Sequence, residues 1–154
     1  MRQLTTLAII EDGKNILLAM KKRGHGEGWY NGYGGKVKEG ETIEEAMARE
    51  LKEESGLIAR KFGERAVLEF FFQGTDKEVE MHVFEVSEYE GDLRETDEMA
   101  PKWFNKLDIP YSKMWSADRD WMRLFLEGHN IEGEATFDGE TKALIKSDFR
   151  IKED

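Results

Sequence analysis

Apolar and polar positions along the chain follow two periods, one typical of strands and the other of helices. Runs rich in β-branched and aromatic residues predict strands at residues 3–10, 16–22, 66–73 and 79–86. The run 101–110 is shorter and indicates part strand and part loop. The tail, 131–149, predicts a hairpin that turns at Asp138-Gly139. Strands are therefore expected in both halves of the chain.

A helix is predicted at residues 43–55, where the apolar positions change to a helical period. Thr42 with Glu45 three residues later forms a capping-box pattern, which marks the start of a helix. Gly56 stands where a left-handed residue commonly ends one. The segment therefore carries its own start and stop signals.

A second helix is predicted at 117–128, with Trp121 and Phe125 at core spacing. Between the second strand and the first helix, residues 24–40 are rich in glycine, and we expect a long irregular loop there. Strands before, between and after two helices predict an α/β fold in which helices flank a mixed sheet. Neither a repeat nor a proline-rich linker divides the chain, so we expect a single domain over 1–154.

Two acidic residues of the first helix fall on its apolar side. On a wheel of about 100° per residue, the apolar stripe consists of Ile43, Ala46, Met47 and Leu51. Glu50 and Glu54 lie inside that stripe, and Glu53 lies at its edge. A solvated face with helix ion pairs does not explain Glu50 and Glu54, because a buried carboxylate without a partner costs several kcal/mol. A hard divalent cation such as Mg²⁺ would relieve both the burial and the repulsion.

Arg49 lies beside Glu53, one turn earlier on the wheel. It is expected either to hold a glutamate in place behind a metal site or to form a plain surface pair. Helix geometry alone does not separate these two interpretations.

Net charge and cysteine content limit the function further. The formal net charge of −10 disfavours binding to a nucleic acid polymer or an anionic membrane, although a divalent metal would still let the protein take a polyanionic substrate. The absence of cysteine excludes disulfides, thiol nucleophiles and zinc–thiolate sites, and it is compatible with a reducing cytosol. The apolar run at 4–10 is too short to span a membrane. We therefore expect a soluble, cytoplasmic protein that acts as a monomer.

The spacing from residue 35 to residue 57 resembles the complete Nudix signature. Gly35 is followed after five residues by Glu41 and after seven more by "RELKEESGL", residues 49–57. The resemblance implies an α/β/α sandwich with a mixed sheet. It also implies hydrolysis of a nucleoside diphosphate linked to another moiety, with Mg²⁺ or Mn²⁺ as cofactor.

The same resemblance assigns roles to particular residues. The implied metal ligands are Gly34, through its carbonyl, with Glu50, Glu53, Glu54 and Glu98. Catalysis is assigned to Glu53, Glu54 and Arg49, one glutamate helping to activate water. Which glutamate deprotonates the water stays open, because neighbouring acids titrate jointly.

A narrower resemblance covers nearly the whole chain. The segments "MKKRGHGEGWYNGYGGKVKEGETIEEAMARELKEESGL", "MHVFEV", "TDEMAPKWF" and "KMWSADRDW" are similar to the MutT-homologue group, animal enzymes that remove oxidised purine nucleoside triphosphates, and to bacterial MutX-like enzymes. This implies cleavage of 8-oxo-dGTP to the monophosphate and pyrophosphate. The implied substrate-binding residues are Thr6, Lys21, Asn31, Tyr33, Gly34, Gly35, Lys36, Phe70, Phe72, Trp115 and Asp118. Asn31 would bond the purine edge and Trp115 would stack on the base.

The sequence departs from this group at two positions. The group has two adjacent aspartates where this chain has Ala117-Asp118. Paired acids share a proton, so one donates to the base while the other accepts. With Asp118 alone we predict a narrower range, in which oxidised guanine is accepted better than oxidised adenine. His25 replaces an aromatic hydrocarbon ring and either stacks or lies in a solvated loop, whereas His82, within a strand, is expected to be structural.

Two other functions stay open. One is a Nudix pyrophosphatase acting on other nucleotides or dinucleotides. The other is a catalytically silent Nudix module that binds nucleotide or RNA. Such modules usually lose glutamates of the signature, and this chain retains all of them.

Overall fold

The computed structural model describes residues 2–153, which fold around one nine-stranded sheet. The strands are β1 (Arg2–Asp12), β2 (Asn15–Lys21), β3 (Tyr30–Asn31), β4 (Tyr33–Lys36), β5 (Ile58–Gln73), β6 (Glu78–Glu90), β7 (Met99–Asn105), β8 (Ile131–Asp138) and β9 (Leu144–Ile151). The helices are α1 (Ile43–Ser55) and α2 (Asp118–Leu126), and a 3-10 turn, η1, covers Tyr111–Lys113.

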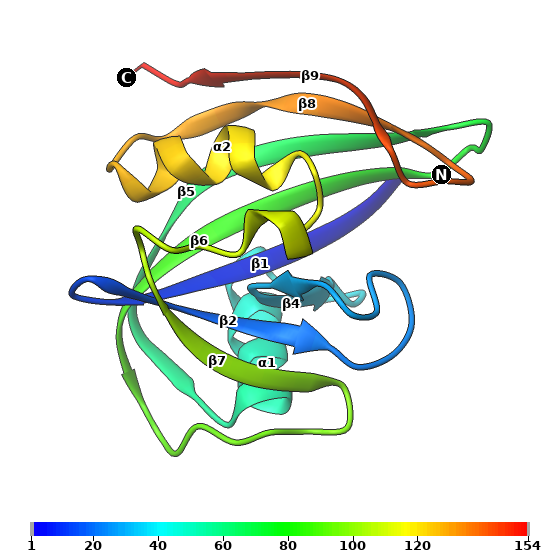
Figure 1. The fold of residues 1–154 in the computed structure, drawn as a ribbon. Coiled ribbons are helices and arrows are strands. Elements are labelled where there is room, and N and C mark those ends of the chain that lie inside the picture. Colours follow the sequence, from blue (N-terminus) through cyan, green and yellow to red (C-terminus); the bar gives the residue numbers. More distant parts are fainter. Residues whose placement is uncertain (1, 154) are drawn as a thin grey trace.

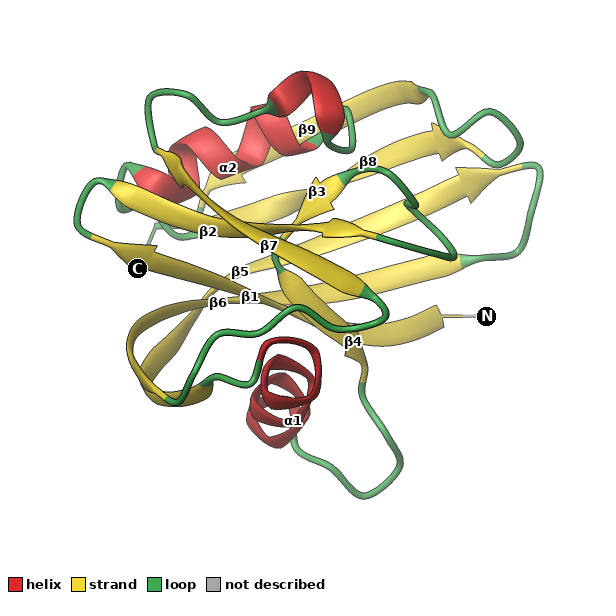
Figure 2. Cartoon of the chain, turned by 60° about the horizontal axis from the view of Figure 1, so that its bottom comes forward, coloured by secondary structure: helices red, strands yellow, loops and turns green. Residues whose placement is uncertain are grey.

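The strand order is β3-β2-β1-β6-β5-β8-β9, with β4 also pairing with β1 and β7 with β2. The pairs β1/β6 and β5/β8 are parallel, and the other pairs are antiparallel. Helix α1 lies on one side of the strands and α2 on the other (Figures 1 and 2). The predicted α/β sandwich with a mixed sheet is confirmed.

Two hydrophobic cores lie on opposite faces of the sheet. Leu7 and Ile9 of β1 pack into the core under α2, while the alternate residues Ala8 and Ile10 pack into the core against α1. A strand that is covered on both sides is a continuous apolar run, which explains the unbroken sequence "LAII". The chain therefore buries the central strand completely and holds a helix on each side of it.

The ends of α1 follow the predicted signals. Thr42 Oγ1 accepts a hydrogen bond from the Glu45 N–H at 3.1 Å, and Glu45 Oε1 accepts one from the Thr42 N–H at 3.0 Å. Gly56 takes the left-handed conformation, with φ of 83°. A side chain at this position would also meet the carbonyl oxygen of Asp92 at 2.6 Å, so the end of the helix is fixed by packing as well.

The prediction of an irregular loop over residues 24–40 is wrong in part, because β3 and β4 form within it. Strand β4 pairs with β1, placing Gly34 opposite Leu7 and Gly35 opposite Thr6. A Cβ at Gly34 would lie 1.8 Å from the carbonyl oxygen of Thr6, so glycine permits an approach that other residues would block. The glycines here serve close strand packing as well as turns.

Strand β5 also begins earlier than predicted, at Ile58 instead of residue 66. Register shifts against β6 occur between Ala59 and Lys61 and between Glu64 and Ala66. These irregularities break the two-residue alternation that reveals a strand in the sequence. The first half of β5 is therefore not recognisable from its pattern.

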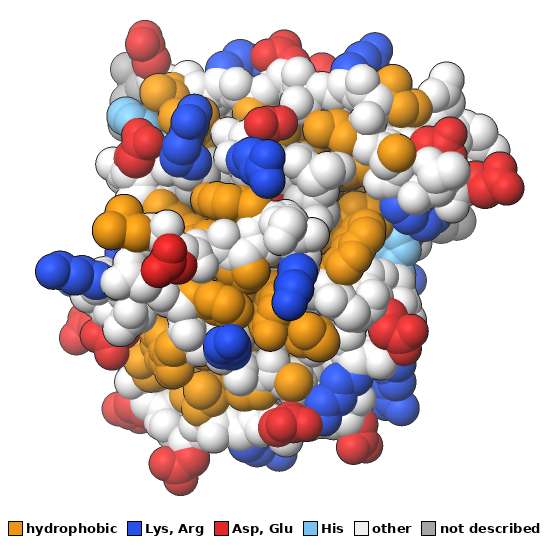
Figure 3. All heavy atoms as spheres, in the orientation of Figure 1, with side chains coloured by type: hydrophobic (Ala, Val, Ile, Leu, Met, Phe, Trp, Pro, Cys, Tyr) orange, Lys and Arg blue, Asp and Glu red, His pale blue; other side chains and the backbone are white. Residues whose placement is uncertain are grey.

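Within residues 2–153 no helix has the length and apolarity needed to cross a membrane. Figure 3 shows hydrophobic side chains gathered near the centre of one face, with charged side chains around and among them. Trp103 on β7 is one of the exposed large hydrophobic residues of the chain, at 37% exposure.

Candidate active site

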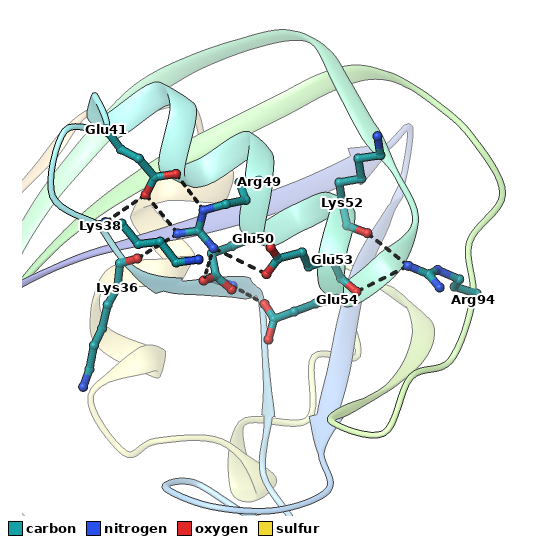
Figure 4. Close-up of polar contacts among 10 residues, drawn as sticks. Lys36, Lys38, Glu41, Arg49, Glu50, Lys52, Glu53, Glu54 and Arg94 are labelled. Carbon is teal, nitrogen blue, oxygen red and sulfur yellow. Dashed lines mark hydrogen bonds and ion pairs between the residues drawn. The ribbon is translucent and has the colours of Figure 1, made fainter.

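Five glutamates line one cavity of about 570 Å³. Helix α1 contributes Glu50, Glu53 and Glu54, and the loop between β6 and β7 contributes Glu95 and Glu98. Glu54 is buried and Glu50 is mostly buried, while the side chain of Glu53 is 57% exposed. Figure 4 shows the three helix glutamates pointing to the same side of α1. The acids predicted to face inward therefore do so, and they meet Glu98 there; we call this the acidic cavity.

Glycines of β4 bring the backbone up to these carboxylates. Glu54 Oε1 accepts a hydrogen bond from the Gly34 N–H at 3.0 Å. A Cβ at Gly35 would lie 2.6 Å from Cδ of Glu50. Any larger residue at Gly35 would push Glu50 away, so this glycine has a specific role in the packing of α1 against β4.

Arg49 connects the acidic cavity to the loop before α1. It binds Glu41 through two hydrogen bonds, Nε to Oε2 at 2.6 Å and Nη2 to Oε1 at 3.0 Å. Its Nη1 donates to Glu50 at 2.8 Å and to Glu53 at 3.4 Å, and Nη2 donates to the carbonyl of Lys36 at 3.1 Å (Figure 4). The Arg49 hydrogen bonds lower the pKa of Glu41 to about 2.

Arg49 contacts a glutamate of the acidic cavity, as the first of the two sequence interpretations expected, and its role as a positioning residue stays a prediction. Its strongest partners are Glu41 and Glu50, while Glu53, the neighbour expected from the helix wheel, is the most distant of the three. Sequence reasoning gave Glu41 no role. Its place in the signature spacing, before the arginine, was the available signal.

Acidic side chains outnumber basic side chains along the acidic cavity, so its negative charge is only partly neutralised. Burial, followed by the charge of Glu50, raises the pKa of Glu54 to about 8 in spite of the Gly34 hydrogen bond. Carboxylate oxygens are the ligands that Mg²⁺ and Mn²⁺ prefer, so the donor set fits a hard divalent ion.

A second cavity, of about 380 Å³, adjoins the first and is lined mainly by aromatic and apolar side chains; we call it the base pocket. Phe70 and Phe72 project into it from the same face of β5. The Trp115 ring lies 6.3 Å from Phe72 and 5.2 Å from Phe137, centroid to centroid. Glu54 lines both cavities, so they lie on either side of this one side chain.

Most residues predicted to bind substrate meet in the base pocket. They are Thr6, Lys21, Asn31, Gly34, Gly35, Lys36, Phe70, Phe72, Trp115 and Asp118. Tyr33 is the exception, because its side chain is 1% exposed and packs in the core with Met47 and Leu51 of α1. Gly34 and Gly35 line the pocket with their backbone, whereas the Tyr33 side chain is directed into the core against α1.

Asp118 is the main polar group deep in the base pocket. Its Oδ1 accepts a hydrogen bond from Nε1 of Trp121 at 3.0 Å, while its buried Oδ2 has no partner within residues 2–153. Burial raises the pKa of Asp118 to about 7. The free oxygen is therefore available both as an acceptor and, when protonated, as a donor to the edge of a ligand.

Asn31 and Thr6 add two further polar groups. Asn31 Oδ1 accepts the Gly32 N–H at 2.9 Å, which leaves the amide NH₂ as the group to offer a ligand. Thr6 Oγ1 is buried and without a partner in the described chain. Aromatic walls with a few polar groups are typical of a pocket that binds a planar, polar ring.

The two histidines considered in the sequence have different surroundings. The His25 ring lies 4.8 Å from Trp115 and meets Phe72 edge-on at 5.9 Å, so it belongs to the aromatic wall. Burial, and after it the charge of Lys77, lowers the pKa of His25 to about 4. His82 is buried between Glu64 and Glu80, and it does not line either cavity.

Several lining residues were not found from the sequence. They are Gly26, Trp29, Lys77, Met81 and Phe137, among others. Phe137 shared a two-residue alternation with Ala135, but the sequence did not show that β8 lies next to β5. Strand neighbours, more than residue type, determine this half of the site.

Comparison with known proteins gives consistent results. A profile described as NUDIX domain matches residues 1–125. The chain is 43% identical to the oxidized purine nucleoside triphosphate hydrolase of Danio rerio over 137 residues, which is 89% of this chain and 88% of that protein. It is 38% identical to the Mus musculus protein of the same name over 145 residues, 94% of this chain and 93% of that protein. The fold matches the crystal structure of a MutT protein from Bacillus halodurans, with a TM-score of 0.83 at 24% identity over 96% and 97% of the two chains.

Proposed function

Because the chain belongs to the Nudix family, as the spacing over 35–57 predicted, we propose that it hydrolyses oxidised purine nucleoside triphosphates. The substrate class is that named for the Danio rerio and Mus musculus relatives. The reaction would convert 8-oxo-dGTP to the monophosphate and pyrophosphate. It would remove damaged nucleotides before a polymerase could use them.

One observation carries this proposal: an aromatic pocket of about 380 Å³ lies next to the acidic cavity, and Glu54 lines both. A purine held between aromatic side chains would leave its phosphates directed at the carboxylates. Those carboxylates would repel the phosphates unless a divalent cation lay between them.

The residues divide the work between the two cavities. Glu50, Glu53, Glu54 and Glu98 would hold the divalent ion, which supplies charge neutralisation at the phosphates and acidifies a water molecule. Arg49 keeps Glu50 oriented, because it is itself held by both oxygens of Glu41. Phosphoryl transfer depends more on charge and positioning than on covalent help from the protein. Proton removal falls to one of the helix glutamates.

The base is selected in the other cavity. Trp115 and His25 offer ring faces for stacking, and Asn31 and Asp118 offer hydrogen bonds to the purine edge. Ala117 is fully buried in the core under α2 and provides no second carboxyl group. Asp118 alone can either donate to the base or accept from it, depending on whether it is protonated. This supports the narrower range of oxidised purines that the sequence predicts.

We also propose Mg²⁺ as the working metal, with Mn²⁺ as a substitute, because the donors are oxygen atoms. The expectations of a cytoplasmic monomer that does not bind a nucleic acid polymer stay predictions.

A substrate panel tests the proposed function. Pyrophosphate release is measured with Mg²⁺ for 8-oxo-dGTP, 2-hydroxy-dATP, dGTP and ADP-ribose, with Glu54→Gln as the blank. We expect 8-oxo-dGTP to have the highest kcat/KM, ahead of 2-hydroxy-dATP by roughly 10-fold, the effect of one hydrogen bond. If dGTP and ADP-ribose exceed both oxidised purines, the substrate class is wrong and only membership of the family stands.

A further inference from the structure

Two lysines outside the Nudix signature gather beside the base pocket. Lys77 comes from the turn between β5 and β6, and Lys142 from the turn between β8 and β9. Their Nζ atoms lie 5.0 Å and 5.7 Å from the centroid of the Phe72 ring. Lys77 lines the pocket together with Lys21 and Lys36. This local excess of positive charge occurs in a chain whose net charge is −10.

A backbone hydrogen bond joins the two turns, because the Gly139 N–H donates to the carbonyl of Gln73 at 2.9 Å. Within the second turn, Lys142 Nζ donates to the carbonyl of Gly139 at 2.6 Å. A Cβ at Gly139 would lie 2.5 Å from the Gln73 carbonyl oxygen, so the turns approach as closely as glycine allows. The position of Lys142 beside Phe72 is therefore part of the fold.

Neither lysine forms a close ion pair among residues 2–153, since no carboxylate lies within 4.0 Å of Nζ of Lys77 or Lys142. The nearest acidic influence on Lys142 is Asp138, whose pKa is lowered first by backbone hydrogen bonds and then also by the charge of Lys142. Burial lowers the pKa of Lys77, and the nearby charges of Lys142, Lys36 and Lys21 lower it further. Like charges held together at a half-buried site are unfavourable unless an anion joins them.

We propose that Lys77 and Lys142 form an anion-binding rim on the base pocket that attracts the polyphosphate tail of the incoming nucleotide before a metal ion draws that tail to the acidic cavity. This inference rests on the proposed function, since it assigns a role within the same site. The rim would act on the tail and the aromatic wall on the base. Affinity should therefore increase with the number of phosphates, even before a metal ion is bound.

The test measures ligand binding by tryptophan fluorescence in excess chelator, which removes turnover from the readout. The ligands are 8-oxo-dGTP, its monophosphate and the nucleoside 8-oxo-deoxyguanosine, with dGTP, dGMP and deoxyguanosine in parallel. We expect Lys77→Gln/Lys142→Gln to weaken triphosphate binding by roughly 3- to 30-fold, and nucleoside binding by less than about 2-fold. The salt dependence of triphosphate binding should also become shallower.

A matched control is Lys61→Gln/Lys152→Gln, which removes the same charge at the opposite ends of β5 and β9. It should leave all affinities within about 2-fold of the parent, since charges beyond a Debye length are screened. An equal loss for nucleoside and triphosphate, an equal loss in the control, or no loss at all would overturn the rim. If 8-oxo-dGTP is bound but never hydrolysed with Mg²⁺, the proposed function is wrong. The difference in affinity between triphosphate and nucleoside still shows whether the rim binds the phosphates.

Discussion

The acidic cavity and the base pocket share Glu54 but are assembled in different ways. The acidic cavity draws three of its five glutamates from a single turn and a half of α1. The base pocket draws its walls from β1, β2, β5, β6, β8 and the segment before α2, which only the sheet brings together. The chemistry of the site is thus encoded locally, and its selectivity is encoded by tertiary structure.

The two regions also differ in charge. In the acidic cavity, burial and then the charge of Glu50 raise the pKa of Glu54 to about 8, whereas the base pocket is aromatic and bordered by lysines. A nucleotide lying across both would present its ring to the aromatic wall and its phosphates to a metal ion. Substitutions in one region should therefore change turnover, and substitutions in the other should change affinity.

The largest expected effect is on kcat, and it comes from Glu54, the residue that lines both cavities. Glu54→Gln should lower kcat by on the order of 10²- to 10³-fold, since it removes a ligand charge at the reacting phosphates. The thermal stability at pH 7 should not fall, because the burial that raises the pKa of Glu54 favours a neutral side chain. Pyrophosphate release and thermal unfolding measure the two quantities. A variant that keeps more than a tenth of the parent turnover would contradict a metal role for Glu54.

Trp115→Ala should show the opposite behaviour. Loss of a ring that stacks on the base should raise KM by about 5- to 150-fold, with kcat nearly unchanged. Trp103→Ala is the matched control, because Trp103 is exposed on β7 and lines neither cavity. Steady-state kinetics with 8-oxo-dGTP measures both variants. If the control raises KM as much, or if Trp115→Ala lowers kcat alone, the division between the two regions is wrong.

Glu41→Gln tests whether the acidic cavity depends on residues outside it. It removes one charge from the pair that holds Arg49, so Glu50 should lose its fixed orientation. We expect the Mg²⁺ concentration for half-maximal activity to rise by about 10-fold, with little change in KM for the nucleotide. Glu45→Gln is the control, because Glu45 caps α1 through its own hydrogen bonds. Within residues 2–153, Arg49 forms its side-chain ion pairs with Glu41, Glu50 and Glu53 instead. Equal metal requirements for Glu41→Gln and the parent would refute this positioning role.

Asp118→Asn should have a smaller effect, a change in the stability of the fold that depends on pH. The folded pKa of Asp118 is about 7, above the value near 4 of an unfolded carboxyl group. The folded state therefore keeps the proton over this interval, and stability is lost as the pH rises from about 4 to 7. Asparagine cannot ionise, and its amide oxygen can still accept from Trp121.

The Tm of Asp118→Asn relative to the parent should therefore rise between pH 5 and pH 8. The corresponding gain in the free energy of unfolding has an upper limit on the order of 4 kcal/mol, because the pKa of Asp118 is raised by about three units on folding. Thermal unfolding across this pH range measures the difference. A Tm difference that stays constant with pH would show that Asp118 does not titrate in the fold as described.

The sequence predicted the acidic cavity better than the base pocket, for a physical reason. Thr42, Glu45 and Gly56 mark the ends of α1, and the spacing of Met47 and Leu51 shows which side of the helix packs into the core and so turns Glu50 and Glu54 inward. These relations span at most one helix. They are therefore visible in a short stretch of sequence.

The base pocket depended on contacts between distant segments. Phe137 lies beside Phe72 because β8 pairs in parallel with β5, and no local pattern shows this pairing. Lys77 and Lys142 come together through two turns of unrelated sequence. The resemblance supplied Trp115 and Asp118, but it also named Tyr33, whose side chain is directed into the core against α1.

The most direct test of the account is the metal dependence of turnover, because the link between the two cavities requires a cation between carboxylates and phosphates. Pyrophosphate release from 8-oxo-dGTP is followed in excess chelator and again after Mg²⁺ is added back. The account predicts that turnover disappears with the chelator and returns with Mg²⁺, while the nucleotide still quenches tryptophan fluorescence in both conditions. Undiminished turnover in excess chelator would contradict it.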